Sequence, residues 1–323
     1  MKKIIIILAA LSASLVSCNK TTAETPEVKS GIPMSVSVSF ADLTKTTVVP
    51  DGDALKCTWD AEESISIITL DALSKGKVVA IDNFTSSGAA GRSSAKFAGR
   101  FTGGANPVKV ILVYPALEKV GDTYRTKPHQ SLYSGGTSSV LSDIKIGKAT
   151  LKAKVGYPFV QGADNDCSHF QDFCVMVGNA DLSKIKSGKL SASLRNLMTV
   201  FEIRINFNRI DNGKKLTKLQ FGNTFDFPLF LHESTSYVDL DASKFSEGSD
   251  IITKKNISIP ANFKVPDPSG YVRMYVPCVP CAASTAMIDF HFTLDGAVKA
   301  VYRDLKSRNF EAGKMYTAGY LYP

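Results

Sequence analysis

The sequence predicts an all-β protein built from antiparallel β-sandwiches, and three observations support this fold class. Apolar and polar residues alternate with a period of two in several segments, which is the pattern of half-buried strands. These segments are short and separated by turns marked by Gly, Pro or Asp, a spacing typical of antiparallel sandwiches. Long helical periodicity appears nowhere, so alternating strand and helix units are not expected.

The length and composition indicate two globular domains. The chain has 323 residues, of which 44% are hydrophobic and 21% charged. We expect an N-terminal β-sandwich domain over residues 32–164 and a C-terminal one over residues 165–323. The net charge of +8 comes from scattered Lys and Arg, without the basic stripe and interleaved aromatics of nucleic-acid-binding proteins. A nucleic-acid partner is therefore not expected.

Residues 1–18 have the pattern of a secretion signal, with a charged start and an apolar core over residues 4–11. This core is too short to span a bilayer. The end of the signal, Leu15-Val16-Ser17-Cys18, resembles the lipobox of bacterial lipoproteins. The resemblance implies cleavage before Cys18 and a lipid on Cys18 that anchors the chain to the outer membrane. The alternative is an ordinary signal peptide with an incidental Cys. Residues 19–31 are polar, which predicts a flexible linker, or leash, between the lipid and the fold.

The clearest strand runs from Met34 to Phe40, where Met34, Val36, Val38 and Phe40 alternate with three serines. Further strands of the first half are expected over residues 55–59, 65–70, 78–84, 95–101 and 108–114. Trp59 is the only tryptophan. Its place beside turn residues favours a core side chain over a ligand platform.

The second half continues in the same style, after a lysine-rich segment at residues 144–155 that could form an edge strand. One helical turn is expected at residues 181–186. Asp295-Gly296 predicts a hairpin turn. Two strands are expected within residues 188–207, and single strands over 216–221, 226–231, 257–260, 271–276, 288–294 and 298–305. Residues 173–177 form a short apolar run, and the chain ends with the segment 310–322.

The sequence offers no catalytic, cofactor or metal site. Cys278 and Cys281 form a CxxC at what reads as the end of a strand, whereas a redox site needs a helix N-terminus. Buried thiols or one local disulfide are the favoured alternatives. The segment 164–166 carries carboxylates without the spacing of a known calcium loop, and His291 lies on the polar face of its strand. Motifs of hydrolases, metalloproteases and nucleotide-binding enzymes are missing from the sequence, which favours a non-enzymatic protein.

Four places together resemble the fimbrillin family, the subunits of type V pili. They are the lipobox followed by the alternating strand 34–40, the Trp-containing segment 56–67, the pair of segments 95–99 and 110–115, and the closing segment 310–317. Two departures concern the subfamily more than the fold: Glu63-Ser64 replaces a common Gly-Asp turn, and Arg195-Asn196 stands where a His is common.

The resemblance implies two transthyretin-like β-sandwich domains and a pilus subunit, or a pilus accessory or anchor protein, with a role in adhesion. In pilus-forming relatives a protease removes the first strand, and another subunit fills the groove with its own strand. Met34, Val36, Val38 and Phe40 would be the inward residues of that removable strand. Lys45 is the candidate cleavage site, because no Arg precedes Arg92. Partners would be other pilus subunits, the outer membrane through the lipid, and a host or bacterial surface ligand.

A second hypothesis comes from another class of protein. A monomeric surface lipoprotein could bind glycan or another ligand, with Tyr124, Tyr133 and Tyr237 stacking on sugar rings. Tyrosines in strands more often serve packing, so the pilus interpretation is preferred.

Overall fold

A computed structural model describes residues 31–40, 47–51, 54–70, 78–88, 90–104, 107, 109–126, 150–152, 163, 175–197, 199–207, 213–223, 237–239, 244–245, 256–265, 272–278 and 281–321. Its contacts separate Met1–Ser30 from Gly31–Pro323. The described part is nearly all β-structure, so the predicted all-β class is confirmed. No helix in these residues is long and apolar enough to cross a membrane.

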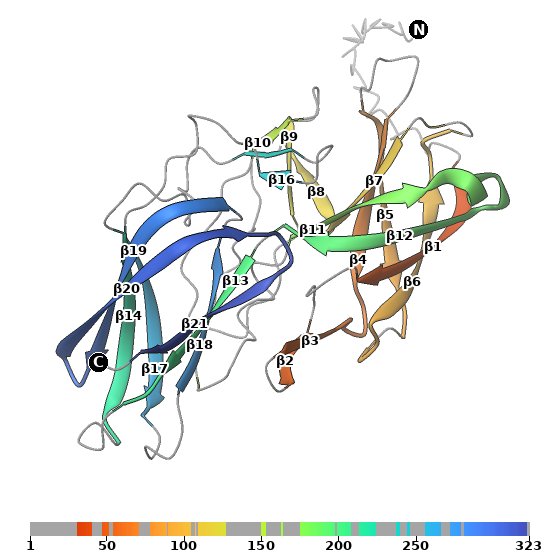
Figure 1. Ribbon diagram of the computed structural model, residues 1–323. Coiled ribbons are helices and arrows are strands. Elements are labelled where there is room, and N and C mark those ends of the chain that lie inside the picture. Colours follow the sequence, from red (N-terminus) through yellow and green to blue (C-terminus); the bar gives the residue numbers. More distant parts are fainter. Residues whose placement is uncertain are drawn as a thin grey trace, which may run out of the picture. The chain divides into compact units, whose positions relative to one another are not determined.

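Seven strands form a closed β-barrel in which neighbouring strands are hydrogen-bonded in the order β1-β12-β11-β7-β4-β5-β6 (Figure 1). The sheet closes because β1 pairs with both β6 and β12. The barrel strands are β1 (Ile32–Phe40), β4 (Ser64–Leu70), β5 (Val78–Ser86), β6 (Ser94–Phe101), β7 (Lys109–Tyr114), β11 (Met176–Asp181) and β12 (Lys189–Asn196).

The barrel core follows from the alternation in these strands. In β6 and β12 every second residue is buried, and in β4 and β7 almost every residue is. Strands buried on both faces read as continuous apolar runs, which fits the sequence of β4 and β7. The buried cluster contains Met34, Val36, Val38, Trp59, Ile65, Ile67, Phe84, Ala95, Phe97, Phe101, Val110, Leu112, Tyr114, Met176, Leu190, Ala192 and Leu194.

A single 3₁₀ helix, η2 (Leu182–Ser187), connects β11 to β12, at the place where the sequence predicts one helical turn. Asp181 caps its first turn, and Gly188 ends it with φ 69°, a conformation that favours glycine. Strands β11 and β12 lie beyond residue 164, yet they are part of the barrel. The division of the chain at 164/165 stays a prediction.

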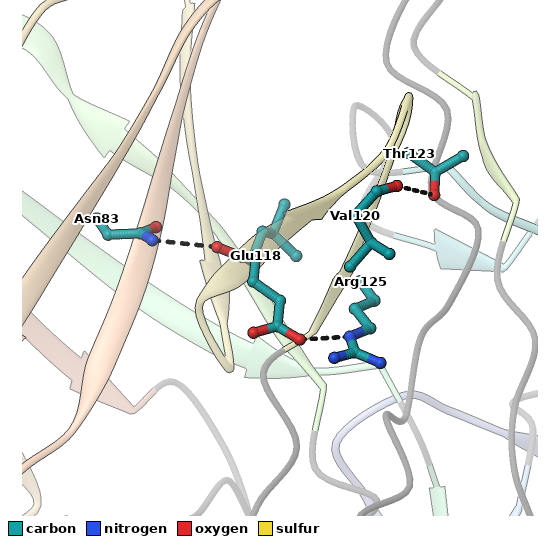
Figure 2. A network of polar contacts seen from close by, with 6 residues as sticks. Asn83, Glu118, Val120, Thr123 and Arg125 are labelled. Carbon is teal, nitrogen blue, oxygen red and sulfur yellow. Dashed lines mark hydrogen bonds and ion pairs between the residues drawn. The ribbon is translucent and has the colours of Figure 1, made fainter. Parts of the chain in front are cut away.

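Two hairpins accompany the barrel strands. One joins β2 (Thr47–Asp51) to β3 (Ala54–Thr58), and the other joins β8 (Leu117–Val120) to β9 (Thr123–Thr126). Figure 2 shows how the second hairpin is held: the Asn83 side chain donates to the Leu117 carbonyl at 3.1 Å, and Arg125 pairs with Glu118 across the hairpin. The Leu117 amide also donates to Ser66 Oγ at 2.7 Å. The hairpin base is therefore fixed to β4 and β5.

The second half contains a four-stranded sheet, β17-β14-β19-β20, and a three-stranded sheet, β18-β13-β21. Aromatic contacts join the two sheets: the ring centroids of Phe201 and Phe310 lie 4.9 Å apart, and the Phe207 ring packs edge-on against the Phe292 ring. A small sheet has the order β10-β15-β16. The bounds are β10 (Thr150–Lys152), β13 (Thr199–Ile205), β14 (Lys215–Asn223), β15 (Tyr237–Asp239), β16 (Lys244–Phe245), β17 (Asn256–Lys264), β18 (Val272–Cys278), β19 (Cys281–Leu294), β20 (Ala297–Phe310) and β21 (Met315–Leu321).

The predicted hairpin turn at Asp295-Gly296 is confirmed, since both residues have positive φ and lie between β19 and β20. This hairpin is longer than expected, because β19 begins at Cys281 and β20 reaches Phe310. Of the other expected strands, residues 226–231 lie outside the described residues.

Candidate functional site: the groove that holds the first strand

Strand β1 fills the seam of the barrel. It runs antiparallel to β6, with Ile32 opposite Phe101 and Ser39 opposite Ser94. On its other side it runs parallel to β12, with Ser35 opposite Lys189 and a register that continues to Phe40. No other strand in the described residues joins β6 to β12. Loss of β1 would therefore leave two open strand edges facing each other.

The two faces of β1 differ as the alternation predicts. Met34, Val36 and Val38 point into the core with exposed fractions of 5%, 0% and 1%. Phe40 is half-buried and packs against the same core. The three serines between them are exposed. Fully burying an aliphatic side chain contributes roughly 1.5–3 kcal/mol, so the three inward residues contribute about 5–9 kcal/mol together.

One end of the groove is shaped by glycine. Gly99 lies opposite Met34, and a Cβ at Gly99 would come within 2.8 Å of the Phe84 ring. Only a residue without a side chain lets β6 pass this ring. The Ser35 amide donates to the Gly188 carbonyl at 3.0 Å, just before β12 begins. This end of β1 is therefore held by backbone pairing with β6 and by the bond to Gly188.

The other end is shaped by Trp59, which is fully buried. Its ring stacks on Phe40 with centroids 4.5 Å apart and an interplanar angle of 25°. Phe97 and Tyr114 meet the same ring edge-on at 5.1 and 5.6 Å. The core role expected for Trp59 is confirmed, while its direct contact with the first strand is a finding of the structure.

The outer face of β1 contributes to the lining of a surface depression with a volume of about 750 Å³. The register places Lys96 of β6, Ser37 of β1, Ser191 of β12 and Asp181 of β11 in one row across four strands. A backbone hydrogen bond from Ser183 lowers the pKa of Asp181. None of the residues that line this depression has an aromatic side chain that could stack on a sugar ring. The lining residues are Ser37, Val38, Ser39, Ser87, Gly88, Arg92, Ser94, Ala95, Lys96, Asn179, Asp181, Ser191, Ala192 and Ser193.

Several predicted site residues lie outside the described residues. These are Cys18, Lys45 and Tyr133, so lipidation and cleavage stay predictions. Tyr124 is half-buried in β9, and Tyr237 begins β15. Of the predicted site residues, the described part of the chain brings together only Met34, Val36, Val38 and Phe40 of the first strand.

The CxxC lies at the junction of two strands, as expected: β18 ends at Cys278 and β19 begins at Cys281. His291 lies in β19 and is half-buried. In the part of the chain that the structure describes, no group of three or more His, Cys, Asp or Glu residues is placed to hold a metal ion.

A buried charge cluster in the second half has no signal in the sequence beyond an alternating strand. Glu202 of β13 is 1% exposed, although it lies on the face opposite Ile203 and Ile205. It pairs with Arg204 at 2.9 Å and with Arg273 of β18 at 3.6 Å, and it accepts a hydrogen bond from Thr317 of β21 at 2.8 Å. Glu202 therefore ties all three strands of this sheet together.

No family model matches the chain, and a search of curated proteins finds no match. Among solved structures, the chain matches a proposed cell adhesion protein from Bacteroides ovatus with 10% identity and a TM-score of 0.50, covering 89% of this chain and 91% of that one. A proposed cell adhesion protein from Bacteroides uniformis matches with 13% identity and a TM-score of 0.43, covering 88% and 91%.

The fimbrial anchor protein Mfa2 from Porphyromonas gingivalis also matches, with 10% identity, a TM-score of 0.35, and coverage of 85% of this chain and 83% of that one. At these identities a likeness shows a shared fold and no more. The chain thus shares its fold with the Bacteroides ovatus structure.

Proposed function

We propose that this chain is a non-enzymatic surface lipoprotein of the fimbrillin kind, a pilus subunit or a pilus accessory or anchor protein that assembles by strand addition. The observation that carries the proposal is β1, a terminal strand that closes the barrel by pairing with β6 and β12. One cut after β1 would separate it from every other strand that the structure describes, because all of them follow β1 in the sequence. The segment 41–46, which contains Lys45, follows directly.

Cleavage at Lys45 would not by itself empty the groove. The inward side chains of β1 contribute about 5–9 kcal/mol of burial, and its backbone is paired on both sides. A cut strand would therefore stay bound until another strand displaced it. Backbone pairing supplies affinity for any extended segment, and the inward pockets supply selectivity. Exchange in which one strand enters as the other leaves is the mode that fits this groove.

The proposal also includes two domains, a lipid anchor and an adhesion ligand, of which the architecture supports the first. The seven-stranded barrel, and the pair of sheets that aromatic contacts join in the second half, support two sandwich-like domains of the transthyretin kind. Cys18 would carry the palmitate-containing lipid and deliver the chain to the outer membrane. Without a cut at Lys45, Cys18 would be the permanent anchor. A host or bacterial surface molecule would be the adhesion ligand.

The proposal is tested on outer membranes from cells that produce the full chain. We expect oligomers that resist SDS and a mature N-terminus that begins shortly after Lys45. Lys45→Ala should abolish both, whereas Lys29→Ala, in the predicted leash, should change neither. Labelled palmitate should be incorporated into the full chain and lost with Cys18→Ser.

The outcomes separate the variants of the proposal. A lipidated full-length monomer without cleavage near Lys45 would contradict the shaft-subunit role and would support an anchor role. A chain that is neither lipidated nor exposed on the surface would refute the proposal as a whole.

A further inference from the structure

We propose that Trp59 makes the groove selective for a partner strand that carries an aromatic side chain at the fourth inward position, the place of Phe40. This inference rests on the strand exchange proposed above and adds the chemistry of the partner. Of the four inward residues of β1, only Phe40 has a ring contact with the barrel among the described residues.

Trp59 is held by the barrel and not by β1. Its amide donates to the Arg92 carbonyl at 2.8 Å, and its carbonyl accepts from the Gly91 amide at 2.9 Å. The edge-on contacts with Phe97 and Tyr114 fix the ring from the barrel side. The indole should therefore keep its place after β1 leaves, with the face that Phe40 covered turned toward the groove.

Val36 lies between Phe97 of β6 and Leu190 of β12, and the other two inward positions have small neighbours beside them. Val38 lies between Ala95 of β6 and Ala192 of β12, and Met34 lies opposite Gly99. Such surroundings select for apolar residues of suitable volume, and volume-conserving aliphatic exchanges are usually tolerated there.

The Phe40 position works differently. The Phe40 side chain is only half-buried, whereas Val36 and Val38 are fully buried. The stacked ring adds an attraction that a branched aliphatic residue cannot reproduce, because it comes from the geometry of two π-systems. An aromatic residue should bind about two- to tenfold more tightly here than leucine.

The test uses the full chain with Cys18→Ser and with residues 41–46 replaced by the recognition sequence of a site-specific protease. After cutting, labelled peptides with the sequence of residues 32–40 are offered in excess, and their exchange into the protein is measured. Two peptides are compared, the natural one and one with Phe40→Leu. Trp59 is the only tryptophan, so its emission reports directly on what covers it.

We expect the natural peptide to be favoured about two- to tenfold over the Phe40→Leu peptide, with a shift of Trp59 emission when leucine replaces phenylalanine. In a Trp59→Leu protein this preference should fall toward one. A Val36→Ala peptide is the matched control, because it should lose a similar factor against both proteins. The peptide comparison on the unaltered barrel remains decisive if Trp59→Leu does not fold.

The results distinguish this inference from the proposal beneath it. If the natural and Phe40→Leu peptides exchange equally well, Trp59 selects nothing and the inference is wrong while strand exchange stands. If no peptide enters the cut protein, strand exchange itself fails, and the inference fails with it.

Discussion

The burial of β1 makes a quantitative prediction about two neighbouring residues. Val36 is fully buried between Phe97 and Leu190, whereas Ser37 is exposed on the opposite face of the same strand. We therefore expect Val36→Ala to destabilise the barrel strongly and Ser37→Ala to leave it almost unchanged.

The magnitude follows from the groups removed. Val36→Ala deletes two buried methyl groups, worth about 0.8 kcal/mol each, and leaves a cavity that the paired neighbours β6 and β12 cannot fill by moving inward. The expected loss is about 2–3 kcal/mol. An exposed substitution such as Ser37→Ala usually changes stability by less than about 0.5 kcal/mol. In melting temperature, the first loss corresponds to roughly 5–10 °C for a domain of this class.

The assay is urea unfolding followed through Trp59, whose emission reports on the barrel core alone because the chain has no other tryptophan. Both variants should show the same slope with denaturant, and only Val36→Ala should shift the midpoint. Equal midpoints for the two variants would refute the view that β1 is an integral part of the core, and with it the argument that its loss opens a groove.

Three further predictions concern other parts of the described structure. Gly99→Ala should destabilise the barrel by about 1–3 kcal/mol, because the new Cβ would come within 2.8 Å of the Phe84 ring, and the midpoint of urea unfolding measures this. Glu202→Gln should destabilise the second half by about 3 kcal/mol, since it removes the buried carboxylate charge that pairs with Arg204 and Arg273, as thermal unfolding would show. Asp181→Asn should make thermal stability less dependent on acid pH. The bond from Ser183 lowers the pKa of Asp181 from its ordinary value of 3.8, so the stabilisation is complete above that value and is lost as pH falls below it.

Each of these has a matched control on the surface. The control for Gly99→Ala is Ala98→Ser on the neighbouring residue. The controls for Glu202→Gln and Asp181→Asn are Glu311→Gln and Asp122→Asn. All three controls alter exposed residues and should have little effect on stability. If Glu202→Gln were no worse than Glu311→Gln, the charge cluster would have no role in holding the three-stranded sheet. A pH profile of melting that Asp181→Asn leaves unchanged would rule out the capping contribution.

The alternation of residues 34–40 was sufficient to predict both the strand and its buried face, because a period of two assigns every side chain to one side. It was not sufficient to predict the neighbours of the strand. The partner β12 lies far along the chain and pairs in parallel, and such pairings depend on the register of the whole barrel. The sequence pattern of β1 is the same whichever strands flank it.

Short elements were missed for a related reason. Strands β8 and β9 have four residues each, too few for a period to show, and they are held by side chains of other strands such as Asn83 and Ser66. Glu202 lies on the face opposite Ile203, and the sequence does not predict its burial. A charged residue in a strand normally indicates a solvated face, and only the arrival of Arg273 and Thr317 from other strands makes a buried carboxylate tolerable.

The same alternation that made β1 predictable also explains why it would be replaceable. Its backbone pairs with β6 and β12 through hydrogen bonds that any extended segment can make, and three of its four inward positions require only apolar volume. Such a groove by itself would accept many strands. Selectivity must then come from a contact with directional geometry, and the stacked pair of Phe40 and Trp59 is the one ring contact that β1 makes within the described residues. A barrel that assembles with chosen partners and not with any loose strand therefore needs a feature like Trp59 beside its seam.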